Sequence, residues 1–149
     1  MCDYCDCRSH PEIAALSDDH ERLGELLGRL TRAVADDDRA AAELVGGELH
    51  ALLGTHADRE ERGVFVQLRL ADVGDGYVAL FEDDHKLVHA LLDQCQGPGW
   101  KQAAGDLARV LGDHILREET DLFPAAHQLL TPRQWDAVAA SRYATTQPA

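Results

Sequence analysis

Apolar residues recur along most of this 149-residue chain at alternating intervals of three and four. The first series begins at Ile13 and Leu16, reaches His20 and continues through Leu23 and Leu27. This spacing places its members along one face of an α-helix. The spacing returns in later segments, and each segment has a histidine near the middle of its apolar face. We therefore expect helices whose buried faces each carry an imidazole.

Proline, glycine and acidic turns divide the chain into long helical segments. The predicted helices cover residues 11–35, 39–71, 77–95 and 103–130. Pro124 is expected to kink the last of these, and Thr131 and Pro132 to begin a short further helix. Long helices with short connections predict an all-α fold, an up-down-up-down four-helix bundle with a short C-terminal helix.

The charge balance limits the possible partners. Asp and Glu number 27 against 14 Lys and Arg, which gives a formal net charge of −13. This excess argues against a nucleic-acid partner or an anionic membrane surface, and it suits a protein that holds cations. No apolar run approaches the roughly 18 residues of a membrane span, and the first ten residues contain no hydrophobic signal region. We therefore expect no membrane partner and a cytoplasmic location.

Three of the four cysteines lie within the first seven residues. The predicted organisation is a cysteine-containing tail over residues 1–10, the bundle over 11–130, and a short helix and tail over 131–149. Cys2, Cys5 and Cys7 lie too close together for a distributed disulfide framework. They fit a reducible tail, a zinc or iron site completed by His10, or a redox-responsive thiol group.

Two sequence frames repeat within the chain. Residues 52–65 (LLGTHADREERGVF) and 110–123 (VLGDHILREETDLF) share the frame L-G-x-H-x-x-R-E-E-x-x-x-F. A second frame relates DDHERLGELL, which begins at Asp18, to DDHKLVHALL, which begins at Asp83. The two helix pairs are therefore predicted to be related by a pseudo-two-fold axis. Either aspartate before each histidine of the second frame could orient a ligand imidazole.

These frames predict a metal site. In both copies of the first frame a glutamate follows the histidine after four residues, so each pair shares one helix face. His85 is followed after four residues by a second histidine, His89. A lone histidine on an apolar face is more often a packed core residue, but that reading would have to hold on every long helix and also explain the buried carboxylates. The predicted ligands are His20, His56, Glu60, His85, His89, His114 and Glu118.

The helix lengths predict different heights along the bundle axis for two of the expected ligands, His89 and His114. From His89 to Pro98 is only 9 residues, whereas from Pro98 to His114 is 16. At about 1.5 Å per helical residue the mismatch is roughly 10 Å. We therefore expect several non-helical residues between positions 97 and 105.

Five histidines and two glutamates exceed the needs of one ion and suit two. Nitrogen-rich ligation with carboxylates favours iron, manganese or zinc over magnesium or calcium. Two octahedral ions have about twelve ligand positions, and the imidazoles, two bridging carboxylates and a bridging oxo or hydroxo group fill all but one. A small ligand is expected to bind at the open position.

The order of these residues resembles the hemerythrin-like (HHE cation-binding) family. The resemblance covers roughly residues 13–125, with His, H-x3-E, H-x3-H and H-x3-E on successive helices. It implies two non-haem iron ions that bind O2 or a related diatomic ligand or peroxide. In hemerythrins proper the last carboxylate is an Asp five residues after its histidine; Glu119 occupies that position here. The internal repeat favours Glu118 as the ligand instead.

The second frame aligns Gly24 with His89, so one ion is expected to have three histidines and the other two. We expect Leu23, Gly24 and Leu27 to line a small apolar pocket beside the two-histidine iron; the alternative reading of Gly24 is a helix-packing glycine. The first functional hypothesis is reversible binding or sensing of O2. The alternatives are an enzyme that consumes peroxide or NO or repairs iron–sulfur clusters, and an iron storage or delivery protein.

Overall fold

The computed structural model describes residues 6–144, and all regular structure within that range is helical. The chain begins with a 3-10 turn, η1 (Cys7–Ser9), followed by α1 (Pro11–Ala35) and α2 (Arg39–Arg59). A π-helical turn, η2 (Glu60–Val64), joins α2 to α3 (Phe65–Leu70), and α4 covers Asp75–Gln94. A second π turn, η3 (Glu118–Leu122), joins α5 (Trp100–Arg117) to α6 (Phe123–Leu129), and α7 covers Pro132–Ala144.

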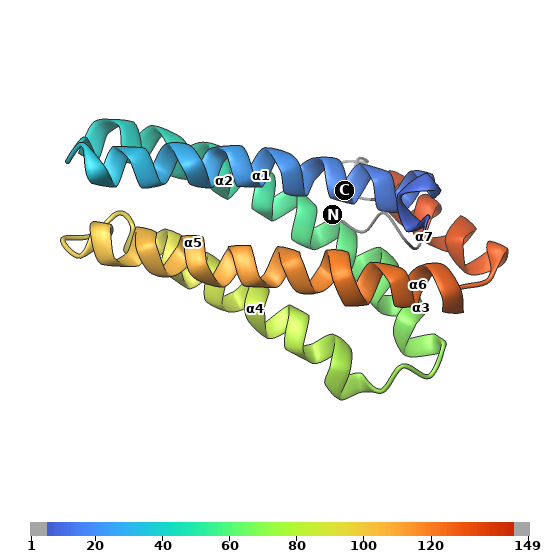
Figure 1. The fold of residues 1–149 in the computed structure, drawn as a ribbon. Coiled ribbons are helices and arrows are strands. Elements are labelled where there is room, and N and C mark those ends of the chain that lie inside the picture. Colours follow the sequence, from blue (N-terminus) through green and yellow to red (C-terminus); the bar gives the residue numbers. More distant parts are fainter. Residues whose placement is uncertain (1–5, 145–149) are drawn as a thin grey trace.

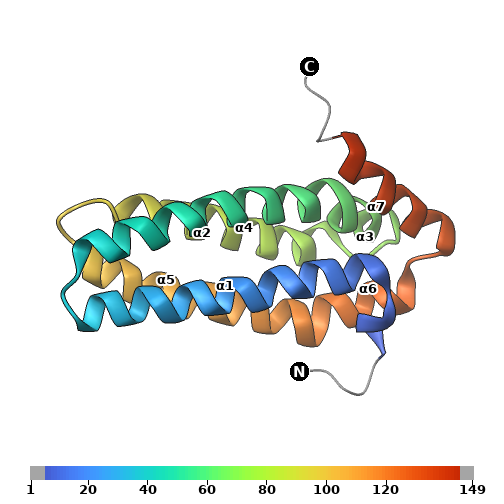
Figure 2. The same ribbon diagram turned by 90° about the horizontal axis from the view of Figure 1, so that it is seen from above.

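Four long rods lie side by side, namely α1, α2 with its continuation α3, α4, and α5 with its continuation α6 (Figure 1). The turns from α1 to α2 and from α4 to α5 lie at the same end of the molecule, and the α3–α4 connection and α7 lie at the other (Figure 2). Successive rods therefore alternate in direction, which fits the expected four-helix bundle. No helix in the described part of the chain is both long and apolar enough to cross a membrane.

Local sequence explains where the helices begin. His10 Nδ1 accepts a hydrogen bond from the Glu12 amide at 3.3 Å ahead of α1, with proline in the first turn. Thr131 Oγ1 accepts from the Gln134 amide at 3.2 Å, as expected for the cap of α7.

Two helices begin earlier than predicted: α4 by two residues, at Asp75, and α5 by three residues, at Trp100. The non-helical residues expected between positions 97 and 105 are limited to 97–99, because α5 begins at Trp100.

The apolar core is divided into two clusters. One is dominated by leucines of α1, α2, α4 and α5, near the end with the two short turns. The other, at the opposite end, contains the aromatic residues Phe65, Phe81, Phe123 and Trp135. Each rod carries one predicted ligand histidine between its residues of the two clusters, so a layer of ionisable side chains separates the clusters. These histidines are His20, His56, His85 and His114.

Only part of the cysteine-containing tail belongs to the described structure. Cys2 and Cys5 lie outside the described residues, and so does the end of the predicted C-terminal tail, so the expected thiol site remains a prediction. Cys7 is buried in the aromatic core cluster. The His10 ring packs against Trp135, with the ring centroids 4.0 Å apart. This contact attaches the start of the described chain to α7.

Candidate metal centre

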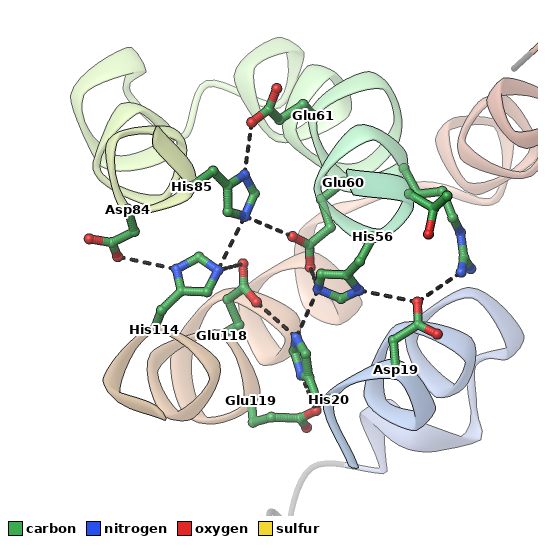
Figure 3. Close-up of polar contacts among 12 residues, drawn as sticks. Asp19, His20, His56, Glu60, Glu61, Asp84, His85, His114, Glu118 and Glu119 are labelled. Atoms are coloured by element: carbon green, nitrogen blue, oxygen red, sulfur yellow. Dashed lines mark hydrogen bonds and ion pairs between the residues drawn. The ribbon is translucent and has the colours of Figure 1, made fainter. Parts of the chain in front are cut away.

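Six buried histidines and glutamates point from all four rods into the layer between the two core clusters (Figure 3). They are His20, His56, Glu60, His85, His114 and Glu118. The Nε2 atoms of His20 and His56 lie 3.1 Å apart, and those of His85 and His114 lie 3.2 Å apart. The imidazoles therefore meet in two pairs, one between α1 and α2 and one between α4 and α5.

Each glutamate lies between the two imidazole pairs. Glu60 places one carboxylate oxygen 3.2 Å from Nε2 of His56 and the other 3.2 Å from Nε2 of His85. Glu118 places its oxygens 3.0 Å from Nε2 of His114 and 3.0 Å from Nε2 of His20. Two sets of possible ligands result, each with its ligand atoms within 4.8 Å of one another. The His20 group is His20, His56, Glu60 and Glu118, and the His85 group is His85, His114, Glu60 and Glu118.

The outer nitrogen, Nδ1, of every imidazole faces a further carboxylate. The pairs are His20 with Glu119 at 2.8 Å, His56 with Asp19 at 3.2 Å, His85 with Glu61 at 2.8 Å and His114 with Asp84 at 3.1 Å. Arg59 donates to Asp19 at 3.0 Å, and Arg117 donates to Asp84. Because a carboxylate only accepts hydrogen bonds, a neutral imidazole in any of these four positions carries its proton on Nδ1 and directs the lone pair of Nε2 inward.

With neutral imidazoles, the centre of this layer holds acceptors without donors. Four Nε2 lone pairs and four carboxylate oxygens converge there, and the oxygens of Glu60 and Glu118 have no hydrogen-bond partner. Buried acceptors and buried charge are costly unless cations or donors satisfy them. Neutral imidazole nitrogens and carboxylate oxygens are also the donor atoms that transition metals bind. These residues therefore fit two metal ions that share both glutamates.

The pKa values of the inner side chains also indicate that this layer favours positive charge. Burial lowers the pKa of the His56 imidazole, but the carboxylates of Glu60 and Asp19 outweigh it and raise this pKa to about 10. Burial likewise lowers the pKa of His85, while Glu60 and Glu61 raise it to about 9. Burial raises the pKa of the Glu60 carboxyl, but the facing imidazoles hold it well below its usual value. In the absence of metal, protons supply the charge that these carboxylates require.

A family model described as the hemerythrin HHE cation binding domain matches residues 12–126. This range contains all six inner residues and most of the chain. The chain belongs to the hemerythrin HHE cation-binding family. Searches of curated proteins and of solved structures give no match.

The π turns of this hemerythrin domain place an aromatic ring beside the inner ligands. In η2 the Phe65 amide donates to the Glu60 carbonyl, five residues earlier, and the Phe65 ring stacks on His85 at 5.7 Å. In a regular α-helix a residue five positions later points about 140° away. The wider turn brings Phe65 back to the face of Glu60, and η3 does the same for Phe123, whose ring stacks on His20 at 5.4 Å.

Sequence reasoning did not find the π turns. The available signal was the spacing of two glutamates and a phenylalanine behind each histidine, which is identical in both copies of the first frame. The aspartates ahead of His20 and His85 do orient imidazoles, as expected. They act on the neighbouring rods, because Asp19 contacts His56 and Asp84 contacts His114.

His89 does not join the other predicted ligands in this hemerythrin domain. Its side chain is half-buried, and its ring lies 6.2 Å from that of His50 on α2. Four residues advance a helix by about 6 Å, so His89 lies a full turn beyond the layer that His85 reaches. The expected division into three and two histidines is therefore replaced by two in each group. The connection from α4 to α5 also needs less non-helical chain, because His85 is the residue that has to meet His114.

The structure does not place Gly24 on the same side of α1 as Leu23 and Leu27, with which it was expected to line a pocket. Leu23 and Leu27 are packed in the leucine-rich core cluster. Gly24 lies on the exposed side of α1, and a Cβ atom added there would meet nothing within 4 Å. Of the two alternative glutamates, Glu118 belongs to both ligand groups, whereas Glu119 contacts the outer nitrogen of His20.

Proposed function

We propose that this hemerythrin domain holds two non-haem iron ions and binds O2 or a related small ligand, such as peroxide or NO, at them. The observation that supports it best is the convergence of inward acceptor atoms into two groups that share Glu60 and Glu118. Iron in a site of imidazoles and carboxylates supplies redox chemistry and positions for small ligands.

The residues around the centre have separate tasks. The four imidazoles and two carboxylates bind the ions, and the outer carboxylates fix the orientation and tautomer of each ring. Phe65 and Phe123 cover two of the imidazoles and exclude water from that side. Each group offers two nitrogens and two oxygens, fewer than the six donors of an octahedral ion.

Turnover of peroxide or NO is the second candidate. It is favoured by the equal division of histidines, because neither group has a full set of protein donors and a ligand has a position to occupy in both. Iron storage is less favoured, since the described residues form only these two groups of possible ligands.

Iron loading tests the proposal. Protein loaded anaerobically with Fe2+ should contain two iron ions per chain, and its visible spectrum should change on exposure to O2. Reversal on degassing would support binding, and loss of many equivalents of peroxide per protein would support turnover. A chain that holds a single iron ion would contradict the dinuclear centre. His50→Ala, which changes an exposed histidine outside both groups, is the matched control.

A further inference from the structure

The two ligand groups match in their inner residues but differ in what lies outside them. Glu119, which holds His20, has a side chain only 10% exposed, and Arg8 Nε lies 3.6 Å from its Oε2. Glu61, which holds His85, has a side chain 42% exposed. Within residues 6–144 no lysine or arginine forms an ion pair with Glu61. One outer carboxylate is therefore covered by a cation, and its counterpart faces solvent.

Arg8 is itself fixed in place. It belongs to η1, which is anchored by the burial of Cys7 and, through His10, by the ring contact with Trp135. Its guanidinium also donates to Glu21 on α1 at 3.0 Å. These contacts hold the arginine between the carboxylates of Glu21 and Glu119.

A surface hollow of about 330 Å³ adjoins this ion pair. Its lining comprises Arg8, Glu21, Gly112, Ile115, Leu116 and Glu119. Because Glu119 contacts Nδ1 of His20, the hollow ends one side chain away from the ligand layer. Loss of the Arg8 side chain would widen it at that point.

We propose that Arg8 keeps the His20 group closed to metal exchange by holding Glu119 against His20, so that metal ions enter and leave through the His85 group. This inference rests on the proposed dinuclear centre. An ion can leave only after an imidazole turns away from it. His20 can turn only if Glu119 separates from Arg8, whereas Glu61 can follow His85 toward solvent without separating from a lysine or arginine. Arg8 thus acts as a positioning residue for His20.

Release of Co2+ to a chelator tests this inference. Protein loaded with two Co2+ ions and mixed with excess EDTA should lose its visible cobalt absorption in two phases of equal amplitude. Arg8→Ala should accelerate the slow phase by up to about tenfold, at the lower end of the effect of removing a partner that orients a metal ligand directly, because Arg8 acts through Glu119. Arg8→Lys should keep most of the slow phase, because a cation still faces Glu119. Arg29→Ala, which removes an exposed arginine paired with Glu48, should leave both phases unchanged.

Two further variants, each combined with Arg8→Ala, show which ligand group releases its ion in the slow phase. His114→Ala weakens the His85 group, so Arg8→Ala should accelerate release of the ion that remains. His56→Ala weakens the His20 group, and Arg8→Ala should then have no effect. Release of two Co2+ ions in a single phase, or equal effects of Arg8→Ala in both backgrounds, would overturn this inference alone. Protein that binds fewer than two Co2+ ions would overturn the dinuclear centre and this inference with it.

Discussion

The half of the chain that contains α1 and α2 and the half that contains α4 and α5 agree wherever a residue acts on the ligand layer. Every inner ligand, outer carboxylate and stacked phenylalanine of one half, and the arginine that pairs with its outer aspartate, has a counterpart at the same frame position in the other. The halves differ at Gly24 and His89, which lie outside the layer, and at Arg8, which covers only one group. A residue without a counterpart is therefore a poor candidate for an ion ligand in this fold.

The largest expected effect comes from the shared glutamates. Glu60→Gln and Glu118→Gln each remove one charge from both groups, so each variant should lose tight binding of both ions. Breaking a buried ionic contact costs about 3–5 kcal/mol, which corresponds to more than about a hundredfold in affinity. Isothermal titration with Fe2+ or Co2+ measures this, with Glu48→Gln as the exposed control. If one variant kept both ions, the halves would not be equivalent.

Removal of the metal should destabilise both halves together, since each glutamate connects them. At a free metal concentration about a thousandfold above Kd, each bound ion stabilises the fold by about 4 kcal/mol. For a chain of this size that is roughly 10 °C in Tm for each ion. Thermal unfolding with and without chelator measures the shift, and Glu60→Gln should show little of it. Equal Tm values for the loaded and chelated wild-type chain would contradict a structural contribution of the metal.

The outer aspartates provide a matched pair for a smaller effect. Asp19→Asn and Asp84→Asn each replace a carboxylate that accepts from an outer imidazole nitrogen and also pairs with an arginine. Each should weaken binding of one ion by about ten- to a hundredfold. Metal titrations of the two variants should resemble each other. A loss in only one of them would show that the repeat does not extend to the outer carboxylates.

The metal-free protein should become less stable as pH rises above neutral. The pKa values of His56, about 10, and His85, about 9, both lie above the ordinary histidine value of 6.5. Protonated imidazoles therefore stabilise the folded state fully below about pH 6.5, and this contribution is lost as pH rises through 9 to 10. Unfolding of chelated protein between pH 7 and 10 checks the sign. Metal-loaded protein is the control, because the ions have displaced these protons and its Tm should fall less.

The smallest effects are expected at Gly24 and His89, which occupy the same frame position in the two halves but lie outside the ligand layer. His89→Ala should leave the number of bound ions unchanged, as measured by metal analysis after loading. Gly24→Ala should also keep both ions and should stabilise α1 by about 0.5–1 kcal/mol, since alanine fits an exposed helical position better than glycine. If His89→Ala bound only one ion, His89 would have to be a metal ligand.

Much of this structure could be predicted because the sequence repeats its own pattern. The apolar spacing located the helices, and the paired frames singled out the six residues that meet in the layer. His89 was predicted to be a ligand but lies outside both groups, because a spacing of four residues ensures a common helix face but says nothing about height along the bundle. Glu61 and Glu119 were not foreseen as partners of imidazoles, because their contacts cross from one rod to another and depend on the π turns.

The π turns limit where this chain can change in length. Within η2 or η3 the number of residues determines which side chains share a face, so one inserted residue would rotate everything that follows by about 100°. The phenylalanine behind the glutamate would then turn away from its imidazole, while the histidine and glutamate before it stayed in place. Insertions should therefore be tolerated in the connections between rods and rejected in these ten residues. A designed copy of the site on ideal helices would keep its ligands and lose its aromatic cover.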